Sequence, residues 1–271
     1  MLKHRVISAI CMLAVFLWGL FAWPYQYFAL FLLLLVALGG WEWARLGGLR
    51  SSVHRGGYAI VTAAIATPLV LPELAALPAV YLLAPAALFW LGAAIVLLRD
   101  KVPEPLRDDA STWRLAIAPP LLALVLWSML WLRDSSIGSP WLFLYVFCAI
   151  WLADIAAYFV GRKWGRHKLA PNTSPGKTRE GFYGGMLAVG LWAVLALLTK
   201  PFEISASVLL VATLLAGFFA VIGDLFESYL KRSAGVKDSG RLLPGHGGVL
   251  DRIDSALAAI PVFVFIVAIG V

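Results

Sequence analysis

The chain has 271 residues, of which 62% are hydrophobic and 14% are charged, and its formal net charge is +7. Soluble domains carry roughly 25% charged residues, so this composition excludes an ordinary soluble protein and predicts an integral membrane protein. The apolar runs approach the length of about 20 residues that crosses a bilayer, and they are continuous rather than alternating. Continuous runs favour helices over a barrel. We therefore expect an all-α, polytopic membrane fold.

In chain order, the elements are about nine transmembrane helices joined by tight turns and polar loops. The first run follows Lys3 and Arg5 and ends among Trp18, Phe21 and Trp23. No small-residue cleavage site stands there, so a retained helix is predicted instead of a signal peptide. The expected spans are 6–21, 25–43, 58–72, 77–98, 115–133, 140–160, 182–199, 205–230 and 250–270.

The basic residues are distributed by side. With a cytosolic N-terminus, all Lys and Arg residues except Arg133 and Lys200 fall in cytosolic segments. The positive-inside rule predicts this bias, so the charge indicates topology and not nucleic-acid binding. We expect a multi-pass protein of the inner membrane with an external C-terminus. Cys11 and Cys148 lie in apolar runs and are predicted to be packing residues.

The two halves of the chain differ. The first five spans hold almost no internal charge, whereas the last four flank polar cytosolic loops at 161–181 and 231–251. We therefore divide the chain into a transmembrane scaffold, 1–135, and a catalytic part, 136–271.

Carboxyl groups occur within the later spans, where each costs at least a few kcal/mol and is a functional candidate. Asp154 and Asp224 lie about six residues inside the cytosolic ends of their spans, and Asp251 and Asp254 begin the last span. Glu227 follows Asp224 by three residues and precedes Lys231 by four, so these three side chains share a helix face. Three helices are thus predicted to bring acids to one depth. Either they form structural ion pairs or they bind a divalent cation with phosphate oxygens.

The first polar loop is predicted to be a structured turn because glycines and prolines punctuate it. Gly176-Lys177-Thr178 matches the end of a P-loop, but Pro171 stands where that motif needs its first glycine. A P-loop nucleotidase is therefore rejected. Lys177, Ser174 and Thr178 remain candidates for holding phosphate, against the alternative of a basic loop that touches lipid headgroups.

The second loop is the most specific feature of the chain. Lys231, Arg232 and Lys237 supply positive charge, and four glycines surround Pro244 and His246, where backbone can approach a ligand closely. His246 is either a hydrogen-bonded loop residue or a substrate contact.

From Ser228 to Asp254 the sequence resembles the signature of the phosphatidate cytidylyltransferase (CDP-diacylglycerol synthase) family. The stretches 154–161 and 174–181 resemble the family too, although Gly176 stands where a second Lys is common. The good match covers roughly the last 120 residues. The residues that carry the signature are Lys231, Arg232, Lys237, Asp238, Gly240, Leu243, Pro244, His246, Gly247, Gly248, Asp251, Arg252 and Asp254.

The resemblance implies that CTP and phosphatidate react to give CDP-diacylglycerol and diphosphate, with Mg²⁺. On this hypothesis Asp224 and Asp251 hold the metal, and Asp254 and Asp154 are further ligand candidates. Catalysis would involve Asp224, Asp251, Lys231 and Arg252. The substrate phosphates would be bound by Ser174, Lys177, Thr178, Arg232, Lys237 and His246.

Two other function classes remain open, namely a CTP-dependent polyprenol or phytol kinase and an ion-coupled transporter. Participation of a second, monovalent cation also stays open. So does a homodimer, for which Gly184, Gly185 and Gly190 would allow close helix contacts.

Overall fold

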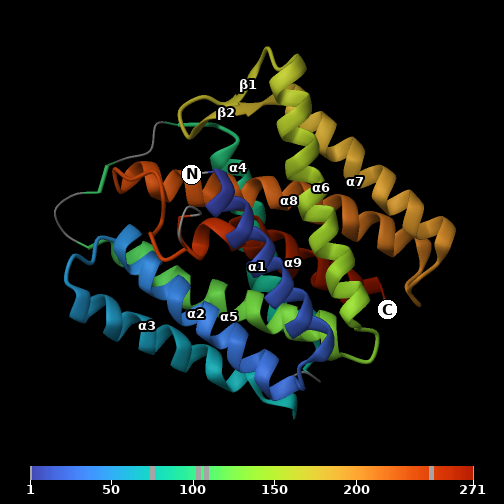
Figure 1. Ribbon diagram of the computed structural model, residues 1–271, viewed down its shortest axis with the longest axis horizontal. Coiled ribbons are helices and arrows are strands. Elements are labelled where there is room, and N and C mark those ends of the chain that lie inside the picture. The colour runs from blue at the N-terminus through green and yellow to red at the C-terminus, as the bar shows by residue number, and fades with distance from the viewer. Residues whose placement is uncertain (1, 74–76, 102–104, 107–109, 244–246, 271) are drawn as a thin grey trace.

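A computed structural model gives the fold for residues 2–73, 77–101, 105–106, 110–243 and 247–270, with side chains from residue 10 onward. Helices dominate it, as the apolar runs predict (Figure 1). The elements are α1 (Leu2–Ala22), α2 (Tyr25–Leu46), α3 (Ser52–Ala66), the 3₁₀ turn η1 (Thr67–Val70), α4 (Ala79–Leu97), α5 (Thr112–Asp134), α6 (Pro140–Trp164), β1 (Lys168–Ala170), β2 (Ser174–Thr178), α7 (Arg179–Thr199), α8 (Ala206–Ser233) and α9 (Leu250–Gly270).

Each predicted span has a helix in the structure. Among the described residues, seven helices are long and apolar enough to cross a bilayer, namely α2 and α4 to α9. The apolar part of α1 described with side chains, Ile10–Ala22, is shorter, and α3 has 15 residues before η1 continues it. A polytopic membrane protein is therefore confirmed, whereas nine full crossings stay a prediction.

Contacts between helix ends agree with the predicted alternation of sides. At one end, Ser111 N donates to Gly47 O at 2.8 Å, and Leu106 N donates to Ser233 O at 2.8 Å. At the other end, the Tyr25 hydroxyl donates to Val70 O at 3.1 Å. In each pair, both partners were assigned to the same face of the membrane.

Arg133, which the charge pattern places on the external side, is not exposed to solvent. It is 8% exposed at the end of α5, where its Nε donates to Leu20 O at 3.0 Å and its guanidinium lies 4.4 Å from the Phe28 ring centre. Asp134 Oδ2 lies 3.6 Å from Arg133 Nη1, and these contacts together reduce the cost of the charge in an apolar setting, although Nη1 itself makes no hydrogen bond among the described residues.

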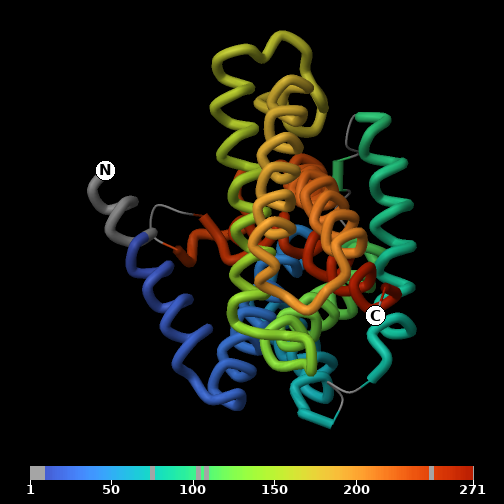
Figure 2. Tube along the Cα trace, turned by 90° about the vertical axis from the view of Figure 1, so that its right-hand side faces the viewer, coloured from blue at the N-terminus to red at the C-terminus, as the bar shows by residue number. Residues whose placement is uncertain are grey.

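One apolar core joins both halves of the chain, from Leu20 to Val267. Helices α8 and α9 pack against each other and cross the middle of the molecule, while α6 and α7 stand beside them with the hairpin at one end (Figures 1 and 2). Residues 136–271 are therefore packed on α4 and α5 of the first part of the chain.

A glycine seam brings α6 and α7 together. A Cβ on Gly185 would lie 2.7 Å from Ala153 O, and one on Gly184 would lie 2.5 Å from the Val160 side chain. Gly190 is near Leu214 of α8. These glycines serve contacts within the chain, so they give no support to a homodimer, which stays a prediction.

Candidate active site

The first polar loop forms a short antiparallel hairpin, which was not predicted. Lys168 pairs with Thr178, and Ala170 pairs with Ser174. Asp100, from the segment after α4, holds the turn: its carboxylate accepts from Asn172 N at 2.9 Å and from Thr173 N at 3.1 Å. The hairpin thereby carries Lys177 on a strand that is fixed at its far end.

The base of the hairpin is fixed as well. The Thr178 hydroxyl accepts from Gly181 N at 3.1 Å and caps α7. A Cβ on Gly161 would lie 2.8 Å from this hydroxyl, so α6 also approaches it closely. Thr178 therefore has a structural role, and a phosphate contact from it stays a prediction, as it does for the half-buried Ser174.

Lys177 reaches the acids of the membrane helices. Its Nζ lies 2.6 Å from Asp224 Oδ2 on α8, and Asp154 on α6 and Asp254 on α9 lie within its electrostatic field. Burial alone would lower the pKa of Lys177, but these carboxylates, Asp224 first, outweigh burial and raise the pKa. The predicted meeting of acids from three helices is confirmed, and their shared partner is an ammonium group from the hairpin.

A second ion-pair group lies one helical turn further along α8. Lys231 Nζ is 2.5 Å from Glu227 Oε2 and 2.7 Å from Asp251 Oδ1. Glu227 is 1% exposed, and Asp254 acts electrostatically on it. The two lysines are thus linked through a continuous set of carboxyl groups, which we call the carboxyl–lysine cluster: Asp154, Lys177, Asp224, Glu227, Lys231, Asp251 and Asp254.

Asp251 is held firmly at the start of α9. Its Oδ2 accepts from Gly248 N at 2.8 Å, from Ser239 Oγ at 2.9 Å and from Ser239 N at 3.0 Å. Its Oδ1 is engaged by Lys231. Direct metal ligation by Asp251 would therefore require one of these contacts to be released.

No three Asp, Glu, His or Cys side chains within the described ranges converge in the way that one metal ion requires. Asp224 and Asp251 are engaged by different lysines, and Asp224 Oδ1 accepts from Ser228 Oγ at 3.3 Å. The metal assignment of Asp224, Asp251, Asp254 and Asp154 consequently stays a prediction.

The remaining predicted contacts lie around the second loop. Arg232, Lys237 and Arg252 are exposed, and Arg232 and Arg252 directly follow the cluster residues Lys231 and Asp251 in the chain. Pro244 and His246 lie outside the described residues, so the contact predicted for His246 stays open. Leu243 N donates to Gly247 O at 2.9 Å, which brings these two residues of the second loop together.

The sequence did not lead us to predict two acids that make structural contacts, Asp100 and Glu42. Asp100 could not be found, because its partners are more than 70 positions away. Glu42 of α2 lies 2% exposed beneath the second loop. A signal for Glu42 existed, since it is a carboxyl group inside a predicted span.

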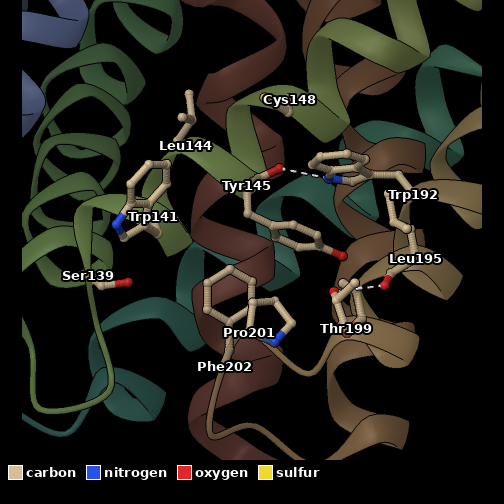
Figure 3. Close-up of a pocket in the computed structure, with 11 residues that line it drawn as sticks. Ser139, Trp141, Leu144, Tyr145, Cys148, Trp192, Leu195, Thr199, Pro201 and Phe202 are labelled. Carbon is tan, nitrogen blue, oxygen red and sulfur yellow. Dashed lines mark hydrogen bonds between the residues drawn. The ribbon is translucent and has the colours of Figure 1, made fainter.

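Two of the cavities that border described residues lie outside the cluster. The larger, about 660 Å³, is bordered by α6, α7 and the segment after α7, at the end of α6 opposite the hairpin (Figure 3). Its lining is mostly apolar, and Trp192 Nε1 donates to Tyr145 O at 3.1 Å, so the indole polar group is satisfied. The smaller, about 500 Å³, is lined by Arg45, Arg50, Arg55 and the end of α8, on the side of the second loop.

Comparisons with known proteins agree with the resemblance in the loops. The sequence model described as the cytidylyltransferase family matches residues 3–269. A phosphatidate cytidylyltransferase of Pseudomonas aeruginosa is 43% identical over 97% of this chain and 96% of its own length. One of Haemophilus influenzae is 37% identical over 97% of each chain, and one of Staphylococcus haemolyticus is 48% identical over 118 residues. The likeness thus extends through the first half, beyond the last 120 residues.

Proposed function

This chain belongs to the cytidylyltransferase family and acts as a phosphatidate cytidylyltransferase, and we propose that its carboxyl–lysine cluster is where CTP meets the lipid phosphate. The observation that supports this placement is the meeting of Asp154, Asp224 and Asp254 from three helices around Lys177. Cluster residues lie near the ends of membrane helices, so acyl chains can stay in the bilayer while the headgroup meets a soluble nucleotide.

The reaction is a substitution at the α-phosphorus of CTP. A phosphatidate oxygen forms the new P–O bond, the bond to the β-phosphate bridging oxygen breaks, and diphosphate leaves. Because a phosphate monoester is anionic near neutral pH, the main barrier is repulsion between anions plus charge on the leaving group. Preorganised cations weaken the repulsion between the anions and stabilise the charge on the leaving group. Lys177 and Lys231 lie within the cluster, and Arg232, Lys237 and Arg252 are exposed basic residues close in sequence to Lys231 and Asp251.

No three acids of the described residues converge on one point, so we propose that the cluster would hold Mg²⁺ only after its lysine contacts rearrange, since carboxylate and phosphate oxygens are the ligands that this ion prefers. The five carboxyl groups outnumber the two ammonium groups, so anionic phosphates would need further positive charge to approach. Asp224, Asp154 and Asp254, which share the field of Lys177, would hold the ion, and Asp251 would join if Lys231 or a loop donor released it. When bound, Mg²⁺ would neutralise phosphate charge and stabilise the leaving diphosphate. A second, monovalent cation remains a further proposal.

We also propose that the protein lies in the cell inner membrane with the hairpin and the second loop facing the cytosol, where CTP is available. The bias of Lys and Arg toward these loops supports this orientation.

Labelled CTP separates this reaction from its rivals. With purified protein, phosphatidate and Mg²⁺, label at the α-phosphate should move to the lipid and label at the γ-phosphate should appear in diphosphate. A kinase would instead move the γ-phosphate to the lipid, and an ion-coupled transporter would move neither. The proposed activity is refuted if the α-phosphate stays in water-soluble products.

The placement of the site has its own test. Asp224→Asn and Asp251→Asn should each abolish turnover at saturating Mg²⁺ while the protein still inserts and elutes as a single species in detergent. Near-normal turnover in Asp224→Asn would remove that carboxylate from the site.

A further inference from the structure

Glu42 is a buried carboxyl group that the reaction chemistry above does not use. It lies on α2, in the first half of the chain, and is 2% exposed. Its Oε2 accepts from Leu250 N at 2.9 Å and from Ser239 Oγ at 3.1 Å. One side chain of the first half therefore contacts the second loop at two separate positions, Ser239 and Leu250.

The loop backbone packs directly on this carboxyl group. A Cβ on Gly240 would lie 2.1 Å from Glu42 Oε1, and one on Gly248 would lie 2.3 Å from Glu42 Oε2. A side chain on residue 240 or 248 would therefore collide with Glu42, and only glycine fits at these two positions. The glycines of the signature thus allow close approach to Glu42, in addition to any approach to substrate.

Ser239 joins Glu42 to the cluster. Its hydroxyl lies between Glu42 Oε2 and Asp251 Oδ2, at 3.1 and 2.9 Å, and Asp251 contacts Lys231. The hydroxyl has one hydrogen for two acceptors, so moving either carboxyl group changes the hydrogen bond to the other. The second oxygen of Glu42, Oε1, is buried without a hydrogen-bond partner among the described residues. Burying an unpaired carboxylate oxygen costs free energy, so its presence in the folded chain calls for an explanation.

We propose that Glu42 is a positioning residue, which holds the second loop against α2 at Ser239, Gly240, Gly248 and Leu250 and thereby fixes Asp251 and Lys231 for the reaction. The effect of Glu42 on the reaction rate rests on the proposed function. The contact that holds the loop against α2 does not depend on that function. This role of Glu42 means that a scaffold helix without any catalytic residue determines the geometry of the site.

Two variants of Glu42 test the role. Glu42→Ala removes both acceptors, and the resulting displacement of Asp251 should lower kcat about 100-fold, because a misplacement near 1 Å can cost that much. The KM for CTP should change less than about threefold, since the exposed basic residues remain. Glu42→Gln keeps an oxygen acceptor for Leu250 N and Ser239 Oγ, so it should retain activity within about tenfold of the parent.

Hydrogen exchange gives the readout that does not depend on activity. In Glu42→Ala, the amides of Ser239, Gly248 and Leu250 should exchange faster, while peptides from α6 and α7 keep their parent rates. The control is Glu203→Ala, an exposed acid after α7 that should match the parent in both assays.

The outcomes are separable. Parent kcat together with parent exchange at the three amides in Glu42→Ala would overturn the proposal. Faster exchange spread over all helices would also overturn it, because Glu42 would then support the core in general; Glu42→Gln tests the same point if the alanine variant does not fold. An inactive parent protein would refute the proposed function, while the exchange comparison would still decide the role of Glu42.

Discussion

Lys177 has an electrostatic role that its sequence motif does not reveal. Gly176-Lys177-Thr178 suggests a phosphate-binding loop, yet the ammonium group is 2.6 Å from Asp224 in the structure. The lysine therefore offsets the repulsion among Asp154, Asp224 and Asp254. On the proposed function, this ion pair would have to rearrange when phosphates or a cation arrive, and Lys177 would pass from a carboxylate to a phosphate oxygen.

Replacing Lys177 should affect both catalysis and stability. Lys177→Met should lower kcat about 100-fold or more, the usual cost of losing one preorganised charge contact. The carboxylates raise its pKa in the folded state, so its stabilising contribution is fully present below the unfolded value of 10.5 and is lost as pH rises through the folded value. The difference in Tm between parent and variant should stay constant up to pH 10.5 and shrink above it.

The exposed Lys200 provides the matched control for Lys177. Lys200→Met should keep parent kcat and Tm at all pH values. A difference in Tm between parent and Lys177→Met that shrinks between neutral pH and pH 9 would contradict the raised pKa.

At the scale of elements, the sequence predicts the helices well and the hairpin not at all. Apolar runs near the thickness of the bilayer predict helices because lipid leaves backbone groups no other partners. Strand β2 contains Pro175 and Gly176, residues that are depleted in strands, and the hairpin forms because Asp100 and Thr178 hold its two ends. Such long-range contacts have no local pattern. Glu42 carried the same signal as the cluster acids, a carboxyl group inside a predicted span, and was overlooked; its partners, about 200 positions away, could not be predicted.

Asp100 allows a test of the hairpin as a support for Lys177. Asp100→Ala removes acceptors from the amides of Asn172 and Thr173, so the turn should loosen and its exchange should rise. Because the base of the hairpin remains capped by Thr178, we expect a partial effect, with kcat lowered about tenfold, each lost hydrogen bond being worth about 1 kcal/mol.

The control for Asp100 is Glu73→Ala, an exposed acid before α4. Rates of exchange in residues 168–178 should distinguish the two variants. Unchanged hydrogen exchange in Asp100→Ala would show that the hairpin is stable without the contacts from Asp100.

At the scale of the whole molecule, the contacts between helix ends and the distribution of charge agree on two faces. The cluster lies near one face, together with the arginine-lined cavity, while the apolar cavity, whose lining Figure 3 shows, lies at the opposite ends of α6 and α7. The charge bias predicts the orientation in the cell, which is open to direct measurement.

Single cysteines should report this orientation. In a background with Cys11 and Cys148 replaced by alanine, Glu203→Cys should react with a membrane-impermeant maleimide on intact cells. Asp238→Cys should react only after the cells are opened. The reverse pattern would invert the topology, and labelling of both on intact cells would contradict the alternation of sides.

The contact between α2 and the second loop has a consequence for exchanging parts among related proteins. A fragment beginning at residue 136 would contain every member of the cluster but neither Glu42 nor Asp100, so it would lack the supports of both loops. Chimeras made with relatives should therefore retain function only when α2 and residues 239–250 come from the same parent. Compatibility at that one contact, and not overall sequence identity, would decide which combinations are active.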